Sequence, residues 1–124
     1  MQVYPLHSNY LRAEIIPFGA RLMSLKSLDK ENTWINVTGG YDTVEAYTNK
    51  NNYYGAICGR YANRIAFGKF ILNHQTFQLD INHGQHHLHG GAVAIHNQYW
   101  SVVDHAKDRI SFKITLQDGE MGYP

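Results

Sequence analysis

Histidine is concentrated in one short segment of this chain. The stretch NHGQHHLHGG, residues 82–91, contains four of the chain's eight histidines, which are His83, His86, His87 and His89. Imidazole is a common zinc ligand, but a zinc site needs three or four ligands that converge on one point. The glycines at positions 84, 90 and 91 disfavour the helix that would align these side chains. The sequence therefore predicts no metal site and favours a single histidine with its own role.

His89 is the best candidate for that role. It follows an apolar residue, Leu88, and precedes Gly90 and Gly91. The two glycines allow a sharp backbone turn and leave the ring accessible to a ligand. A neutral imidazole donates and accepts hydrogen bonds and titrates near working pH, so it can take part in proton transfer. The alternative interpretation is an ordinary surface histidine in a loop.

A second polar group lies in GRYANRI, residues 59–65. Arg60 and Arg64 stand within an otherwise apolar region, with Asn63 beside the second of them. A guanidinium in such surroundings needs acceptors, which can be a carboxylate, backbone carbonyls or the oxygens of a ligand. Asn63 offers both a donor and an acceptor. These residues would suit a polyhydroxylated ligand, although a structural ion pair is the commoner reason for an embedded arginine.

The elements that must position these two segments are predicted to be antiparallel β-strands. Most of the chain consists of short runs with alternating apolar residues between turn residues, and no segment has a sustained period of 3.6. Strands are predicted over residues 11–17, 20–28, 33–37, 99–105 and 109–116, with a hairpin over residues 69–80 that turns at Asn73–His74. Residues 43–47 favour a single helical turn, and residues 50–54 indicate a loop that enters a strand. The predicted fold class is all-β.

Length and composition limit the class of protein. The 124 residues correspond to one domain, and a net charge of +1 gives no basis for a nucleic-acid partner. No apolar segment approaches the roughly eighteen residues of a membrane span, and the N-terminus does not resemble a signal peptide, so a cytoplasmic protein is expected. The single cysteine, Cys58, cannot form an intramolecular disulfide and is interpreted as a buried, inert thiol. The final QDGEMGYP is typical of a turn, which predicts either a flexible tail or a connection to a further element.

The two polar segments, in this order and at this separation, resemble the aldose 1-epimerase (galactose mutarotase) family. In that family a Gly-Arg-x-x-Asn-Arg-Ile segment leads to a Gly-x-Phe strand, a hairpin, and then a loop with Asn-x-Gly and Leu-His-Gly-Gly. The stretch NNYYGAICGRYANRIAFGKFILNHQTFQLDINHGQHHLHGG follows this pattern, and IIPFGARLMSLK and DGEMGYP are similar to other parts of the family sequence. The resemblance implies a large antiparallel β-sandwich with the sugar in a cleft over one sheet. This chain would be its N-terminal part.

The resemblance implies roles for three residues. Asn63 and Arg64 match the pair that contacts the sugar hydroxyl groups, and His89 matches a histidine that contacts the sugar near its anomeric carbon. The family's acid, a second histidine, and its base, a glutamate, lie beyond the turn at which this chain stops. Neither position is matched by Glu14, Glu31, Glu45, Glu120, His96 or His105. The other clustered histidines, His83, His86 and His87, match no functional position of the family.

The expected function is therefore that of an aldose 1-epimerase, which interconverts the α and β anomers of a hexose such as galactose or glucose. Ring opening requires an acid and a base poised near neutral pH, and neither a metal nor an organic cofactor is needed. The alternative is a catalytically inactive carbohydrate-binding remnant that lacks the family's acid and base. A small-molecule sugar is the expected partner, with no nucleic acid and no membrane. Homo-oligomers, or pairing through open sheet edges, are also expected.

Overall fold

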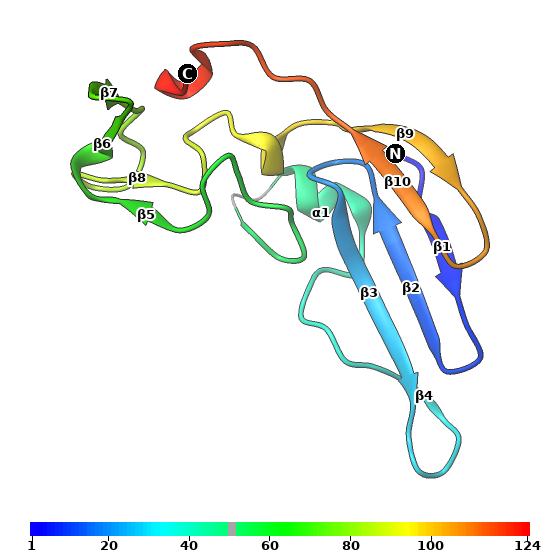
Figure 1. Ribbon diagram of the computed structural model, residues 1–124. Coiled ribbons are helices and arrows are strands. Elements are labelled where there is room, and N and C mark those ends of the chain that lie inside the picture. The colour runs from blue at the N-terminus through cyan, green and yellow to red at the C-terminus, as the bar shows by residue number, and fades with distance from the viewer. Residues whose placement is uncertain (50–51) are drawn as a thin grey trace.

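The computed structural model describes residues 1–49 and 52–124, and most of its regular structure is β-strand (Figure 1). The largest unit is an antiparallel sheet in the order β1 (Tyr4–His7), β2 (Leu11–Ile16), β3 (Arg21–Leu28) and β4 (Trp34–Asn36). Three two-stranded ribbons accompany it: β9 (Ser101–His105) with β10 (Ile110–Lys113), β5 (Arg64–Ile65) with β8 (His87–Leu88), and β6 (Lys69–Leu72) with β7 (Gln75–Gln78). The predicted all-β, antiparallel class is confirmed.

The four-stranded sheet contains one strand that the sequence analysis missed. β1 includes Pro5, which cannot donate a hydrogen bond to a neighbouring strand and therefore resembles a turn residue in the sequence. β1 lies at the edge of the sheet and pairs only with β2 within it, and a proline is tolerated at such an edge. The neighbouring pair of β2 and β3 has a bulge, because Glu14 pairs with Ser24 and Ile15 pairs with Leu22.

The ribbon of β9 and β10 packs against this edge. The backbone amide of His7 donates to the carbonyl of Lys107 over 2.8 Å. The ring of Tyr4 makes edge contacts with the rings of His105 and Phe112, at centroid distances of 5.3 and 6.4 Å. The predicted strand pair is confirmed, but β10 ends at Lys113 rather than at residue 116. Beyond Lys113 the chain leaves the ribbon and runs to the C-terminus on the far side of the molecule (Figure 1).

The predicted hairpin over residues 69–80 is also confirmed. Asn73 and His74 form its two-residue turn, with φ angles of 49° and 62°. Positive φ at both central residues is the mark of a type I′ turn, whose twist matches that of the two strands. The predicted helical turn is present as α1 (Val44–Asn49), which continues to Asn49. In the parts of the chain that the structure describes, no helix is long and apolar enough to cross a membrane.

The loop predicted over residues 50–54 begins outside the described residues, which resume at Asn52. No strand follows it before β5, so the prediction that this loop enters a strand was wrong. The described part of the segment instead runs along the start of β3 and is joined to that region by two backbone hydrogen bonds, from Leu22 to the carbonyl of Gly55 and from Ile57 to the carbonyl of Gly19. Hydrogen bonds from the side chain of Arg21 to Asn52 and Tyr54 hold the segment in place of the regular backbone hydrogen bonds of a strand.

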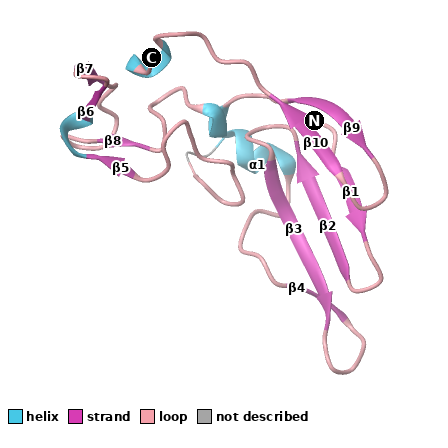
Figure 2. Cartoon of the chain, in the orientation of Figure 1, coloured by secondary structure: helices cyan, strands magenta, loops and turns pink. Residues whose placement is uncertain are grey.

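The centre of the molecule lies where the start of β3, α1 and residues 94–96 meet, between the large sheet and the ribbon of β5 and β8 (Figure 2). The largest fully buried side chains are Arg21, Tyr47, Ile16, His87 and His96. The hydroxyl of Tyr47 donates to the carbonyl of Met23 over 3.3 Å. Cys58 is half-buried, and burial raises the pKa of its thiol, so the thiol stays protonated at neutral pH.

Candidate sugar site

The pairing of β5 with β8 brings two of the predicted site residues together. Arg64 pairs with Leu88 in this antiparallel ribbon, so Asn63, which precedes β5, lies opposite His89, which follows β8. The backbone amide of His89 donates to the carbonyl of Asn63 over 3.0 Å. In return, the backbone amide of Asn63 donates to the Nδ1 atom of His89 over 2.9 Å. Residues that are 26 positions apart therefore form one locked unit.

The second of these hydrogen bonds determines the protonation of His89. A backbone amide can only donate, so Nδ1 of His89 is the acceptor and carries no proton. The neutral ring then carries its proton on Nε2, which no described side chain accepts. Burial, and next the nearby charge of Arg64, lowers the pKa of His89 below 6.5. At neutral pH the ring is therefore an uncharged hydrogen-bond donor through Nε2, suited to a sugar oxygen.

Arg64 is held beside this unit by neutral acceptors. Its Nη1 atom donates to Oδ1 of Asn63 over 3.2 Å, and its Nη2 atom donates to Nε2 of His83 over 3.2 Å. The side chain is exposed, so its remaining N–H groups are available to a ligand. Arg60 differs, because its Nη atoms donate to the carbonyls of Pro124 and Gln117 over 2.9 and 2.7 Å. The acceptors are thus backbone carbonyls for Arg60 and a side-chain amide oxygen and an imidazole nitrogen for Arg64, and neither arginine has an aspartate or glutamate partner in the described part of the chain.

The four clustered histidines point to separate partners. His83 contacts Arg64, and Nδ1 of His86 accepts a hydrogen bond from the backbone amide of Phe67 over 3.2 Å. His87 is fully buried, and its Nδ1 atom donates to the carbonyl of Asp80 over 2.7 Å. Outside positions 50 and 51, no three histidine, cysteine, aspartate or glutamate side chains are grouped so that they could hold a metal ion.

The glycines after His89 lie in the predicted sharp turn, in which the backbone amide of Gly91 donates to the carbonyl of Leu88 over 3.1 Å. Gly90 has a φ of 91°, and a Cβ atom on it would overlap the carbonyl of Gly59. Gly91 has a φ of 102°, and a Cβ atom on it would lie 2.8 Å from the side chain of Met121. These glycines therefore allow both the turn and the close packing of the loop against neighbouring segments.

Tyr53 and His96 join the candidate site, and the sequence analysis assigned a role to neither. The ring of Tyr53 lies between two imidazoles, with centroids 4.6 Å from His89 and 4.8 Å from His96. His96 is 1% exposed. Burial first, and then the charges of Arg21 and His89, lower the pKa of His96 to about 4, so its ring is neutral above that pH. The signal that could have indicated Tyr53 is the composition of NKNNYY, residues 49–54, because tyrosine beside asparagine suits surfaces that bind small polar ligands.

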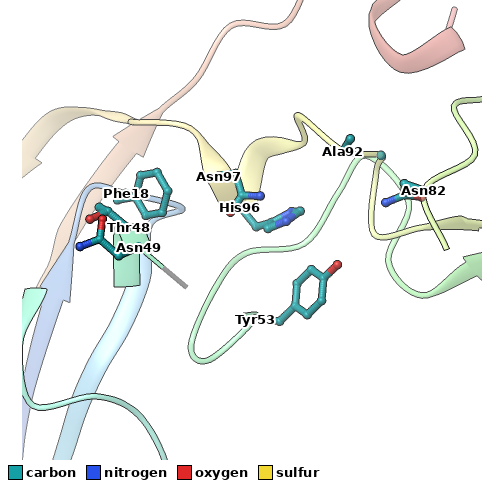
Figure 3. Close-up of a pocket in the computed structure, with 9 residues that line it drawn as sticks. Phe18, Thr48, Asn49, Tyr53, Asn82, Ala92, His96 and Asn97 are labelled. Atoms are coloured by element: carbon teal, nitrogen blue, oxygen red, sulfur yellow. The ribbon is translucent and has the colours of Figure 1, made fainter. Parts of the chain in front are cut away.

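A cavity of about 450 Å³ opens beside Tyr53 and His96 (Figure 3). This volume lies in the range of roughly 300–1,000 Å³ that is typical of small-molecule sites. Its lining is mainly aromatic and polar and, among the described residues, has no side chain that is charged at neutral pH: Phe18, Thr48, Asn49, Tyr53, Asn82, Gly91, Ala92, His96 and Asn97. Asn82 also holds the loop, because its side-chain amide exchanges two hydrogen bonds with the backbone of Leu88, over 2.7 and 2.9 Å.

Arg64 lines a different cavity, of about 500 Å³, with Arg60, Tyr61, Ile65, Phe70, Leu72, Tyr123 and Pro124. Asn63 and His89 are not among the lining residues of either cavity. The structure thus brings Asn63, Arg64 and His89 into one hydrogen-bonded group. That group adjoins the first cavity through the contact of His89 with Tyr53 and the second through Arg64.

Comparison with known proteins identifies the family to which this chain belongs. The family model described as aldose 1-epimerase matches residues 2–124. The galactose mutarotase of Bos taurus is 36% identical over 126 residues, which is 100% of this chain and 36% of that protein. The aldose 1-epimerase of Haemophilus influenzae is 33% identical over 118 residues, which is 95% of this chain and 34% of that protein. The chain belongs to the aldose 1-epimerase family.

Solved structures support the same assignment. An aldose epimerase homologue from C. elegans superposes with a TM-score of 0.91 and 29% identity, over 98% of this chain and 38% of its own. The galactose 1-epimerase of Lactobacillus acidophilus has the same fold, with a TM-score of 0.81 and 22% identity. The chain is thus a partial, N-terminal portion of the galactose mutarotase fold, and it spans about 36% of the length of the curated relatives.

Proposed function

We propose that residues 1–124 form a single domain that supplies the sugar-positioning part of an aldose 1-epimerase acting on a hexose such as galactose or glucose. Asn63 and Arg64 bind sugar hydroxyl groups in this proposal, and His89 donates a hydrogen bond near the anomeric carbon. The observation that carries the proposal is the hydrogen-bonded group of these three residues, in which Asn63 contacts His89 through its backbone amide and Arg64 through its side chain. It offers a neutral Nε2–H from His89 and exposed guanidinium N–H groups from Arg64, and such donors suit the oxygens of an uncharged sugar.

Binding is tested by NMR titration of the chain with D-galactose. We expect the signals of Arg64 and His89 to shift with one dissociation constant. Asn63→Gly allows the positive φ of 67° but removes the side-chain amide, whereas Arg64→Lys and His89→Gln replace the guanidinium and the imidazole by donors of different shape and position. Each variant should weaken binding several-fold, because a hydrogen bond contributes about 0.5–1.5 kcal/mol net. His74→Gln, at the exposed turn between β6 and β7, is the matched control. Absence of shifts up to high millimolar galactose would reject the proposal.

Catalysis is a separate question, because the acid and base that the family resemblance implies match no residue of this chain. Polarimetry of α-D-glucose or α-D-galactose should give the buffer rate for residues 1–124 alone. The sharper test is a chimera in which residues 1–124 replace the matching portion of the Bos taurus galactose mutarotase. Accelerated mutarotation that Arg64→Lys and His89→Gln reduce would support the enzyme. A folded chimera that binds galactose but does not accelerate mutarotation beyond the rate in buffer would favour the alternative, a catalytically inactive carbohydrate-binding remnant.

A further inference from the structure

Arg21, the first residue of β3, is fully buried yet has four hydrogen bonds to neutral groups. Its Nη1 atom donates to Oδ1 of Asn52 over 2.9 Å and to the carbonyl of Tyr54 over 3.2 Å. Its Nη2 atom donates to the carbonyl of Asn52 over 3.1 Å and to the carbonyl of His96 over 3.0 Å. One guanidinium thus joins two loop segments that are more than forty positions apart.

Burying the charged side chain of Arg21 in the core costs free energy. In the described ranges, the ion pairs are Lys30 with Glu31 and Arg109 with Asp104, so Arg21 has no carboxylate partner there. Burial lowers the pKa of Arg21, which reflects the cost of removing its charge from water. An apolar side chain would pack against Phe18 and Tyr47 without that cost. What an apolar side chain cannot do is donate to several carbonyls at once, as the planar guanidinium does.

The acceptors of Arg21 surround the aromatic residue of the candidate site. Asn52 and Tyr54 are the two neighbours of Tyr53 in the chain, and the third acceptor is the backbone of His96 itself. Because Arg21 fixes the backbone on both sides of Tyr53, it fixes the position from which the Tyr53 ring contacts His89 and His96. The glycine at position 19 makes this close approach possible. A Cβ atom there would overlap the carbonyl of His96 and lie 3.1 Å from Nε of Arg21.

We propose that Arg21 is a positioning residue of the candidate site, which holds Tyr53 and His96 in place against His89 from the buried side. It does not touch the ligand in this proposal. It acts through the segment around Tyr53 and through the backbone of His96. The inference depends on the proposed function only in naming the ligand as a sugar, because the contacts of the three rings are properties of the protein without a ligand.

The charge of Arg21 provides a second readout. The titratable groups that face His96 are Arg21 from β3, Tyr53 from the loop between α1 and β5, and His89 from the loop after β8. Burial and Arg21 are the two largest causes of the low pKa of His96. A variant that removes the cation should therefore raise the pKa of His96 toward 6.5, whereas a lysine that keeps the cation nearby should raise it less.

The experiment is aromatic NMR of the chain, because the carbon-bound protons of His89 and His96 lie near the Tyr53 ring and carry its ring-current shift. Arg21→Lys keeps the charge, but its three donors on one nitrogen cannot make the four hydrogen bonds of the guanidinium, so we expect the His89 and His96 resonances to move and galactose to bind several-fold more weakly. Arg21→Met should move the same resonances and also raise the pKa of His96. Arg109→Lys, in an exposed ion pair, is the matched control and should leave both rings unchanged.

Asn52→Ala keeps the experiment decisive if the Arg21 variants do not fold. Asn52 is half-buried in a loop, and its side chain accepts one of the four hydrogen bonds from Arg21. We expect this variant to move the His89 resonance while the amide spectrum of β2 and β3 stays unchanged. Folded variants with unchanged His89 and His96 resonances would overturn the proposal, as would an equal change in Arg109→Lys. If the unmodified chain binds no galactose, the proposed function fails, but the ring resonances still decide the role of Arg21.

Discussion

The backbone amide of Asn63 donates a hydrogen bond to Nδ1 of His89 over 2.9 Å, across the end of the ribbon that β5 and β8 form. This contact makes His89 an acceptor at Nδ1 and therefore a donor at Nε2. His87, two residues earlier, has the opposite arrangement, because its Nδ1 donates to the carbonyl of Asp80 and its Nε2 accepts from the hydroxyl of Tyr123 over 2.6 Å. Two neighbouring histidines thus carry their protons on different nitrogens.

We predict that nitrogen NMR will separate these two tautomers at pH 7.5. His89 should show an unprotonated Nδ1 and a protonated Nε2, and His87 should show the reverse. Lowering the pH should protonate His89 only below 6.5, because burial and the charge of Arg64 lower its pKa. The measurement is a long-range nitrogen–carbon-proton correlation across a pH titration. A protonated Nδ1 on His89 would contradict the hydrogen bond from Asn63 and, with it, the donor role proposed for Nε2.

His96 should make the stability of the protein sensitive to acid. Its pKa is about 4 in the folded protein and about 6.5 when unfolded, so the unfolded state binds a proton first as the pH falls. The stabilisation is complete above pH 6.5 and is lost as the pH falls from 6.5 toward 4. We expect a loss on the order of 2–3 kcal/mol between pH 7.5 and 4.5 from this residue.

Urea unfolding at these two pH values checks the prediction, with His96→Phe as the matched variant. The variant has no titrating ring at this position, so its free energy of unfolding should fall less between pH 7.5 and 4.5 than that of the unmodified chain. Contributions from the other titrating groups are common to both proteins and cancel in the comparison. Equal losses in the two proteins would show that His96 does not titrate with a low pKa in the folded state.

Local patterns in the sequence predicted the elements whose form depends on near neighbours. The turn at Asn73–His74 was predicted because asparagine tolerates positive φ, and alternation predicted β2 and β3. β5 and β8 have only two residues each, which is too short for any periodicity, so their pairing was not predictable from pattern. The resemblance to a family named Asn63, Arg64 and His89, but their mutual hydrogen bonds follow from that pairing.

The burial of Arg21 shows why the rest of the site could not be predicted. An arginine at the start of a strand is expected to be exposed, and nothing near it in the sequence marks it as buried. Its acceptors come from Asn52, Tyr54 and His96, which only the folded chain brings to it. His96 was assigned no role for the same reason, because its contact with Tyr53 joins segments that are more than forty positions apart.

His87 should be a structural residue, in contrast to His89. It is fully buried, and both ring nitrogens have partners in the described part of the chain. His87→Ala would create a cavity and leave the carbonyl of Asp80 and the hydroxyl of Tyr123 without this partner. We expect a loss of about 2–4 kcal/mol in the free energy of unfolding. His74→Ala, at an exposed turn, should change it by less than about 0.5 kcal/mol in a urea titration. A neutral His87→Ala variant would contradict this assignment.

Gly90 should be the least replaceable residue of the loop that carries His89, and Gly84 provides the matched control. Both have positive φ, 91° and 61°, so alanine is strained at either position. Around Gly84 a Cβ atom would meet nothing within 4 Å, whereas at Gly90 it would overlap the backbone of Gly59. Gly84→Ala should therefore cost about 1 kcal/mol, from strain alone, and Gly90→Ala about 3 kcal/mol or more, because backbone atoms must move.

The same comparison tests whether the packing of this loop positions His89. Gly90→Ala must displace either residues 59–60 or the end of β8, and His89 is joined to both regions through Asn63. The variant should thus lose the hydrogen bond that Asn63 donates to Nδ1, which would appear as a mixture of His89 tautomers in the nitrogen spectrum. Gly84→Ala should keep the single tautomer. If Gly90→Ala is as stable as Gly84→Ala and keeps the same tautomer, the close approach of Gly90 to Gly59 does not hold His89 in place.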